Sequence, residues 1–235
     1  MQLTVDSGAF PPSPPPSTTD PAVIAAHDWA AFDAVEKMID HWERPGWSRD
    51  TRAYYWMLTI PEESPLVGHM RQCQQALAPF GFDKIDPDGL HLTFGRVGLV
   101  EEISGDRLDQ LAAAAQQTVP ERFTLQAIPL TASRGAIRYS VAPWTPILDL
   151  YQILHEVGAH HGLPFRKPAA VFRPHIGIAY SNRTLPADGI RAALRPLREL
   201  DPVDIVVEQA HLVELRREEQ AYRWSVVRTL HLMPS

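Results

Sequence analysis

His91-Leu92-Thr93-Phe94 is followed, 84 positions further along the chain, by the related stretch His175-Ile176-Gly177-Ile178. In both stretches a polar or small residue alternates with a large apolar one, which is the pattern of a β-strand with one buried face. Each histidine therefore shares a face with the residue two positions later, Thr93 in one strand and Gly177 in the other. If these two faces meet, both imidazoles line one cleft. The sequence thus predicts two lobes, each presenting one histidine strand.

Strands and helices alternate around these two stretches. Expected strands lie at 53–60, 90–98, 122–131, 135–141, 174–180, 203–215 and 221–230, and expected helices at 66–78, 104–117, 145–160 and 187–198. Each histidine strand is followed by a helix and a further strand at a similar spacing, which indicates a weak internal repeat. Two similar lobes, each with one histidine strand, would explain both spacings.

The N-terminal region has a different composition from the rest of the chain. Six prolines stand among Ser and Thr in residues 8–21, which is typical of extended, unpacked chain. We expect a disordered tail over residues 1–21, with a ligand for a proline-recognition module as the alternative. Apolar residues at helical spacing then predict an amphipathic helix over 21–41, which packs on the domain or caps the cleft. Pro and Gly in residues 44–47 predict a turn, and residues 22–235 form a single domain.

Charge and cysteine content limit the partners and the compartment. The net charge is -6 and the isoelectric point is about 5.9, which argues against binding of long nucleic acid. A small nucleotide or an RNA terminus still fits, because one or two arginines can hold a single phosphate. The only cysteine, Cys73, lies on the apolar stripe of a predicted helix and is expected in the core. The start of the chain lacks the features of a signal peptide or membrane anchor, so we expect a soluble, cytoplasmic protein. We also expect it to be a monomer.

Two histidines suit the cleavage of phosphodiesters without a metal ion. Imidazole titrates near neutral pH, so one ring can accept a proton while the other donates one. Thr93 lies on the face of His91 and can donate a hydrogen bond to a phosphate oxygen. A second group of histidines, His155, His160 and His161, lacks the i, i+4 spacing that a zinc site on a helix needs, and we expect no metal there.

Several motifs occur in the order found in one enzyme family. They are Trp42, Tyr54 and Trp56, Leu90-His91-Leu92-Thr93, Phe172 to Asn182, Glu214-Leu215, and Tyr222-Arg223-Trp224. Together they resemble the 2H phosphoesterase superfamily, in particular the bacterial 2'-5' RNA ligase-like branch of cyclic phosphodiesterases. The resemblance implies a bilobal α+β fold with antiparallel sheets around a central cleft. It also implies action on 2',3'-cyclic phosphate ends or 2'-5' linkages of RNA or small nucleotides, with no metal or cofactor.

The same resemblance assigns roles to individual residues. It implies that His91 and His175 are the acid and base, and that Thr93 donates to the phosphate. The family has Ser or Thr where this chain has Gly177, so only the backbone can bind phosphate there. An alternative function is therefore a catalytically weakened protein that binds a nucleotide or an RNA end.

Two further residues are candidates from strand alternation. Arg173 shares the face of His175, and we expect it either to meet phosphate or to remain solvated. Tyr55 faces away from the core side of its strand and is expected to stack on a base or to pack at the surface. Tyr180 follows the family pattern, but its parity predicts core packing.

Overall fold

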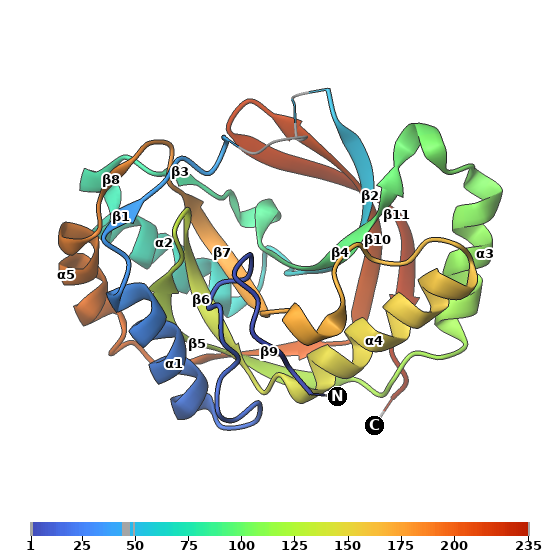
Figure 1. Ribbon diagram of the computed structural model, residues 1–235, viewed down its shortest axis with the longest axis horizontal. Helices are drawn as coiled ribbons and strands as arrows, with labels where there is room; N and C mark the ends of the chain where they lie inside the picture. Colours follow the sequence, from blue (N-terminus) through green and yellow to red (C-terminus); the bar gives the residue numbers. More distant parts are fainter. Residues whose placement is uncertain (1, 44–47, 49, 235) are drawn as a thin grey trace.

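The computed structural model describes residues 2–43, 48 and 50–234, and most of its strands form two antiparallel sheets (Figure 1). The four-stranded sheet has the order β11 (Ala221–His231), β10 (Gln209–Glu218), β2 (Arg52–Thr59) and β4 (His91–Leu99). The five-stranded sheet has the order β3 (Asp83–Lys84), β7 (His175–Tyr180), β6 (Ala136–Ala142), β5 (Phe123–Ala132) and β9 (Val203–Val207). Each sheet contains one histidine strand, so the predicted α+β fold with two antiparallel sheets is confirmed.

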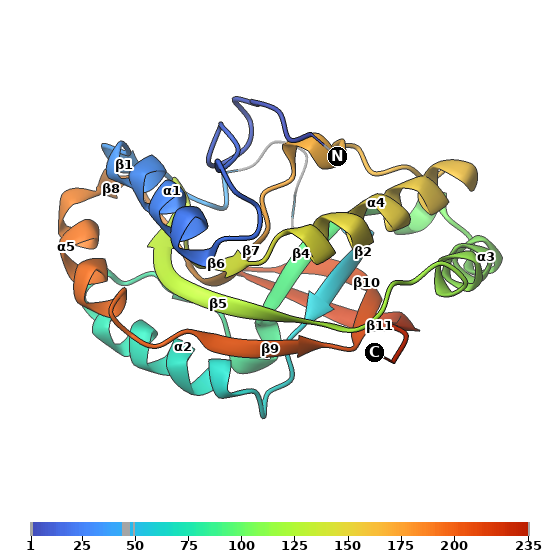
Figure 2. The ribbon, with the colours of Figure 1, turned by 90° about the horizontal axis from the view of Figure 1, so that it is seen from below.

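The helices divide between the two lobes. They are α1 (Pro21–Asp33), α2 (Pro65–Ala76), α3 (Gly105–Gln116), α4 (Thr145–His160) and α5 (Asp188–Leu197). Helices α1, α2 and α5 pack against strands of the five-stranded sheet, whereas α3 packs against β11 and α4 (Figures 1 and 2). Short 3₁₀ turns occur at Ala78–Phe80, Pro87–Gly89, Val100–Glu102 and Ala169–Val171. Within the described residues, no helix has both the length and the apolar character that crossing a membrane requires.

The N-termini of two helices follow directly from local sequence. The Asp20 side chain accepts hydrogen bonds from the backbone N–H groups of Ala22 and Val23 at the start of α1, and the Ser64 side chain accepts one at the start of α2. A proline occupies the first turn of each helix, where its missing N–H is not needed. These caps explain why both helices begin close to the predicted positions.

Helix α1 is shorter than the sequence predicts. It ends at Asp33, and the expected continuation to residue 41 is wrong. Strand β1 (Lys37–Met38) follows and pairs with β8 (Leu185–Pro186), so long-range strand pairing replaces the last helical turns. The expected turn at 44–47 lies outside the described residues.

The expected single strand over 203–215 is also wrong. It is divided into β9, which pairs with β5, and β10, which pairs with β2 in the other sheet. The burial pattern changes phase at this point, since Ile205 and Val207 are buried in β9 but Ala210 and Leu212 in β10. Strand β5 likewise joins the sheet of β7 although it follows β4 and α3 in sequence. The chain therefore crosses between the lobes, and neither sheet is one continuous half of the sequence.

The structure describes residues 2–20 of the N-terminal region, for which the sequence predicts a disordered tail. They contain no helix or strand among the positions described, but their backbone is held against the domain. The N–H of Thr4 donates to the carbonyl of Ala170 at 2.9 Å, and the N–H of Trp144 donates to the carbonyl of Thr18 at 2.7 Å. Pro11 is buried. This N-terminal segment, residues 2–20, is dark blue in Figure 1 and passes beside β6 and β7.

The core extends through both lobes and contains the cysteine. Trp56, Tyr139 and Trp144 are among its largest fully buried side chains. Cys73 is completely buried in α2, as its position on the apolar stripe predicts. Burial raises the pKa of its thiol, which further disfavours a role as a nucleophile.

Candidate functional site

A cavity of about 660 Å³ lies where the two histidine strands approach each other. His91 and Thr93 from β4 line it, together with His175 and Gly177 from β7. The structure therefore has the side-chain alternation that the sequence predicts, and all four residues face the cavity. A pocket of this size can hold a nucleotide-sized molecule.

Both histidines are held in the same way. Nδ1 of His91 donates to the carbonyl of Gly89 at 2.8 Å, and Nδ1 of His175 donates to the carbonyl of Arg173 at 2.9 Å. A carbonyl oxygen only accepts hydrogen bonds, so each Nδ1 carries a proton. In the neutral ring Nε2 then has a free lone pair, and it is the nitrogen available to a ligand.

The cleft keeps both rings neutral at pH 7. Burial lowers the pKa of His91, although the hydrogen bond to Gly89 opposes this change. Burial, together with the nearby positive charge of Arg138, lowers the pKa of His175 to about 3. The rings still border the open cavity, so an anion that enters can stabilise their protonated forms.

Arg138 on β6 lies directly across from Gly177 and therefore on the same face of the sheet. Its side chain is buried at 4.0 Å from the carboxylate of Asp28, which also accepts a hydrogen bond from Ser140. Burial by itself raises the pKa of Asp28, but His27, Arg138 and Ser140 together hold it below its ordinary value. The buried ion pair of Arg138 and Asp28 therefore lies next to Gly177, where the chain has no side-chain hydroxyl.

Sequence reasoning missed Arg138 and a second arginine, Arg96. A charged residue in the apolar strand 136–142 was the available signal for Arg138. Arg96 is three positions from Thr93, so strict alternation places it on the opposite face. The pairing of β2 with β4 contains an irregularity between Trp56 and Met57, which pair with Gly95 and Thr93, and Arg96 pairs with Tyr55 and lines the cavity. A glycine inside a strand is a common sign of such a bulge.

An aromatic wall closes the side of the cavity near His91. The ring of Trp224 meets the His91 ring edge-on with 5.0 Å between centroids. The Tyr222 hydroxyl lies 3.1 Å from Nε2 of His41, whose ring stacks on Tyr180 with 4.0 Å between centroids. Tyr180 is buried as its parity predicts, yet it also borders the cavity. Tyr55 lines the cavity, as predicted from its strand face.

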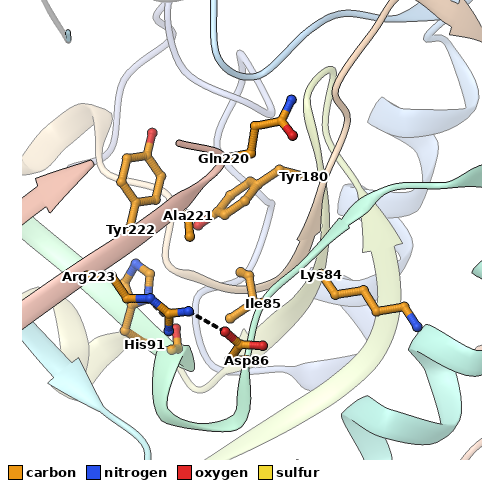
Figure 3. Close-up of a pocket in the computed structure, with 10 residues that line it drawn as sticks. Lys84, Ile85, Asp86, His91, Tyr180, Gln220, Ala221, Tyr222 and Arg223 are labelled. Carbon is orange, nitrogen blue, oxygen red and sulfur yellow. Dashed lines mark hydrogen bonds and ion pairs between the residues drawn. The ribbon is translucent and has the colours of Figure 1, made fainter. Parts of the chain in front are cut away.

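The turn before β4 is fixed by ion pairs across the sheet. Arg223 contacts Asp86 at 2.5 Å and Asp88 at 3.3 Å. Figure 3 shows the ion pair of Arg223 with Asp86; both residues and His91 line a small pocket of about 20 Å³. These contacts hold the turn that carries the carbonyl of Gly89, and so they support the orientation of His91.

The N-terminal segment lies against the opposite side of the cavity. The Arg173 guanidinium donates to the carbonyls of Thr4 at 2.7 Å, Pro11 at 3.2 Å and Pro12 at 3.3 Å. Arg138 donates to the carbonyl of Phe10 at 3.1 Å and lies over its ring. The predicted phosphate contact of Arg173 is therefore not free to form here, because backbone carbonyls occupy its donors.

Within the ranges that the structure describes, no three His, Cys, Asp or Glu side chains gather closely enough to hold a metal ion. Histidine, hydroxyl, arginine and backbone groups are instead the polar groups that a ligand would meet.

The chain is similar to known proteins in both sequence and fold. The model of the 2'-5' RNA ligase superfamily matches residues 61–219. No curated protein sequence is significantly similar to the chain. E. coli LigT, in structures complexed with ATP and with 3'-AMP, is 16% and 18% identical, with TM-scores of 0.55 and 0.54. In both comparisons the match covers 78% of this chain and 99% of LigT.

A second solved structure gives the same result. TT0787 of Thermus thermophilus is 17% identical with a TM-score of 0.56, and the match covers 77% of this chain and 98% of that one. At such low identity the likeness concerns the fold alone. The bilobal 2H phosphoesterase fold expected from the sequence is confirmed.

Replacing Arg173 by alanine is expected to release the N-terminal segment, because the donors that hold three of its carbonyls are lost. Hydrogen exchange of the amides in residues 4–12 measures this change, and we expect it to become at least about tenfold faster, since charged hydrogen bonds contribute roughly 1.5–3 kcal/mol each. Arg71→Ala, on the exposed face of α2, is the matched control. Unchanged exchange in Arg173→Ala would show that other contacts hold the segment.

Proposed function

Because the chain belongs to the 2'-5' RNA ligase superfamily, we propose that it is a phosphodiesterase that uses two histidines and no metal ion. Its proposed substrates are 2',3'-cyclic phosphate ends or 2'-5' linkages of RNA or small nucleotides. The observation that carries the proposal is the matched anchoring of His91 and His175, whose Nδ1 atoms donate to the carbonyls two residues earlier. This anchoring leaves two Nε2 atoms for proton transfer in one cavity.

We assign the base to His175 and the acid to His91. Burial and the charge of Arg138 lower the pKa of His175 to about 3, so its Nε2 holds no proton and is available to accept one from water. That water attacks phosphorus, and the bond from phosphorus to one ribose oxygen breaks. Protonated His91 donates its Nε2 proton to the leaving oxygen. The phosphate anion itself supports this protonation, because a nearby negative charge raises the pKa of an imidazole.

The other predicted residues have supporting roles in this proposal. The Thr93 hydroxyl and the backbone of Gly177 hold the non-bridging oxygens, where negative charge grows in the transition state. Tyr55 offers a ring on which a base can stack. Arg173 reaches phosphate only if the N-terminal segment moves away.

The proposed ligands agree with what is known of similar proteins. LigT has been crystallised with ATP, NADP+, 3'-AMP and phosphate, and small nucleotides or an RNA terminus are the ligands we propose here. The cytoplasmic location and monomeric state expected from the sequence stay predictions.

One observation favours a second candidate function. Gly177 provides no hydroxyl, and a lost transition-state donor lowers rates by roughly 10²- to 10³-fold. A protein that binds nucleotides or RNA ends with little turnover would keep the cavity and tolerate this loss. Measurements of binding and of turnover on the same protein distinguish the two functions.

His91→Ala and His175→Ala are each expected to lower the hydrolysis of 2',3'-cyclic nucleotides and 2'-5' linked dinucleotides by roughly 10²- to 10⁴-fold, as expected for lost acid or base catalysis. The assay contains EDTA and compares both variants with His161→Ala, which changes a histidine outside the cavity. Nucleotide binding by wild type without any turnover would support the binding protein instead. Turnover that survives both substitutions would refute the assignment of the histidines.

Gly177→Ser is expected to raise kcat about tenfold or more, because it restores a hydroxyl beside the phosphate. A Cβ atom here would lie 3.3 Å from Cδ1 of Ile85, a methyl group that can shift by the small amount needed. Gly177→Ala adds the same Cβ without the hydroxyl and is the control. An equal response of both variants would show that the hydroxyl has no part in the reaction.

The pH dependence of the rate follows from the lowered pKa values. In the free protein the pKa of His91, the proposed acid, lies below the ordinary imidazole pKa of 6.5. As the pH rises through this lowered pKa, His91 loses the proton that it donates, so kcat/KM should fall. Bound phosphate raises the pKa, so the fall in kcat should occur at higher pH. Steady-state kinetics across the acid and neutral range measures both profiles. Alkaline limbs at the same pH would contradict this coupling between phosphate and imidazole.

A further inference from the structure

The cavity has a charge opposite to that of the whole protein. The chain carries a net charge of -6, yet none of the described residues that line the cavity is Asp or Glu. Five cationic side chains line it instead: Arg96, Arg138, Arg166, Lys167 and Arg173. Such a concentration of one sign of charge in a cleft attracts anions.

Two of these cations are already engaged, and three are not. Arg138 faces Asp28, and Arg173 donates to backbone carbonyls. For Arg96, Arg166 and Lys167 the structure has no ion pair with any described residue. The Nε of Arg96 is moreover buried with no hydrogen-bond partner among the described residues. Burial removes the water that would accept a hydrogen bond from this N–H group, and no described group takes its place.

These three side chains come from two segments that both line the cavity, β4 and the chain after α4. A Cβ atom built on Gly95 would lie 2.7 Å from the ring of Phe165, so the residue before Arg166 packs against β4 at the position before Arg96. The carbonyl of Lys167 accepts a hydrogen bond from the Tyr151 hydroxyl at 2.6 Å, which helps to hold this segment in place. Arg96, Arg166 and Lys167 thus line the same cavity from neighbouring segments, and they are called the cationic cluster below.

We propose that this cluster binds a second phosphate of the ligand, separate from the phosphate that lies between His91 and His175. Three residues along a strand span about 10 Å at roughly 3.3 Å each, so the backbone of Arg96 lies away from Thr93 and its guanidinium can meet a phosphate other than the one beside Thr93. A guanidinium binds phosphate through two parallel hydrogen bonds, and a lysine adds a further charge. The inference rests on the proposed function, because that function places the first phosphate between His91 and His175.

This subsite defines the substrate class more narrowly. The ligand is a nucleoside that carries one phosphate at its 2',3' edge and another on its 5' oxygen. The second phosphate belongs either to a free nucleotide or to the next linkage of an RNA end, and both present the same anionic group.

Binding measured by calorimetry tests the subsite without turnover. The probes are adenosine 3',5'-bisphosphate and adenosine 3'-monophosphate, in EDTA. We expect wild type to bind the bisphosphate at least about tenfold more tightly, as an added charge-assisted phosphate contact implies. Arg96→Gln, and the double variant Arg166→Gln with Lys167→Gln, should each remove most of this preference, whereas Arg71→Gln on the exposed face of α2 should retain it. Circular dichroism confirms that each variant is folded.

The outcomes separate the subsite from the proposed reaction. Equal affinity of wild type for both probes, or a preference that survives in folded Arg96→Gln, overturns the subsite even if 2',3'-cyclic nucleotides are hydrolysed. A preference that depends on Arg96, without hydrolysis of any substrate, supports the subsite and refutes the proposed reaction. A second binding experiment uses a dinucleotide with a 2',3'-cyclic end as the competitor. If it competes better than the free bisphosphate and depends equally on Arg96, the second phosphate comes from an RNA end.

Discussion

The hydrogen bond from each imidazole Nδ1 to the carbonyl two residues earlier is the interaction on which the site depends. It uses the backbone carbonyl two residues before each strand begins, so the segment that leads into the strand sets the orientation of the ring. Without it, either nitrogen could carry the proton, and Nε2 would have no defined role. In the proposed reaction, the bond therefore leaves one Nε2 atom on each of the two strands available for proton transfer.

The two anchors are supported by different means. On the β4 side, the ion pairs of Arg223 with Asp86 and Asp88 bind the preceding turn to β11. On the β7 side, the anchoring carbonyl belongs to Arg173, and the buried pair of Arg138 and Asp28 stands beside the strand. The second arrangement places a positive charge near the ring, which adds to burial in lowering the pKa of His175. One fold thus gives two similarly anchored histidines different electrostatic surroundings, and such a difference is what separates an acid from a base.

The sequence predicted those parts of the site that depend on local alternation. The facing of Thr93, Tyr55 and Gly177 follows from parity within single strands. Arg96 could not be found in this way, because a bulge at Gly95 changes which face it occupies. Features that depend on contacts between distant segments were also beyond local pattern. The N-terminal segment lacks regular structure, and its order comes from donors on Arg173 and Arg138, more than 120 residues away in the sequence. Proline-rich composition describes how a segment behaves alone, and it carries no information about unsatisfied donors elsewhere in the fold.

Arg173 contributes both to the orientation of His175 and to the position of the N-terminal segment. Its carbonyl accepts the Nδ1 proton of His175, while its guanidinium holds the carbonyls of Thr4, Pro11 and Pro12. The residue that orients one reactive ring is therefore also the residue that secures the segment beside the cavity. The two contacts use different atoms, so the backbone carbonyl that anchors His175 does not depend on the hydrogen bonds that the guanidinium makes to the N-terminal segment.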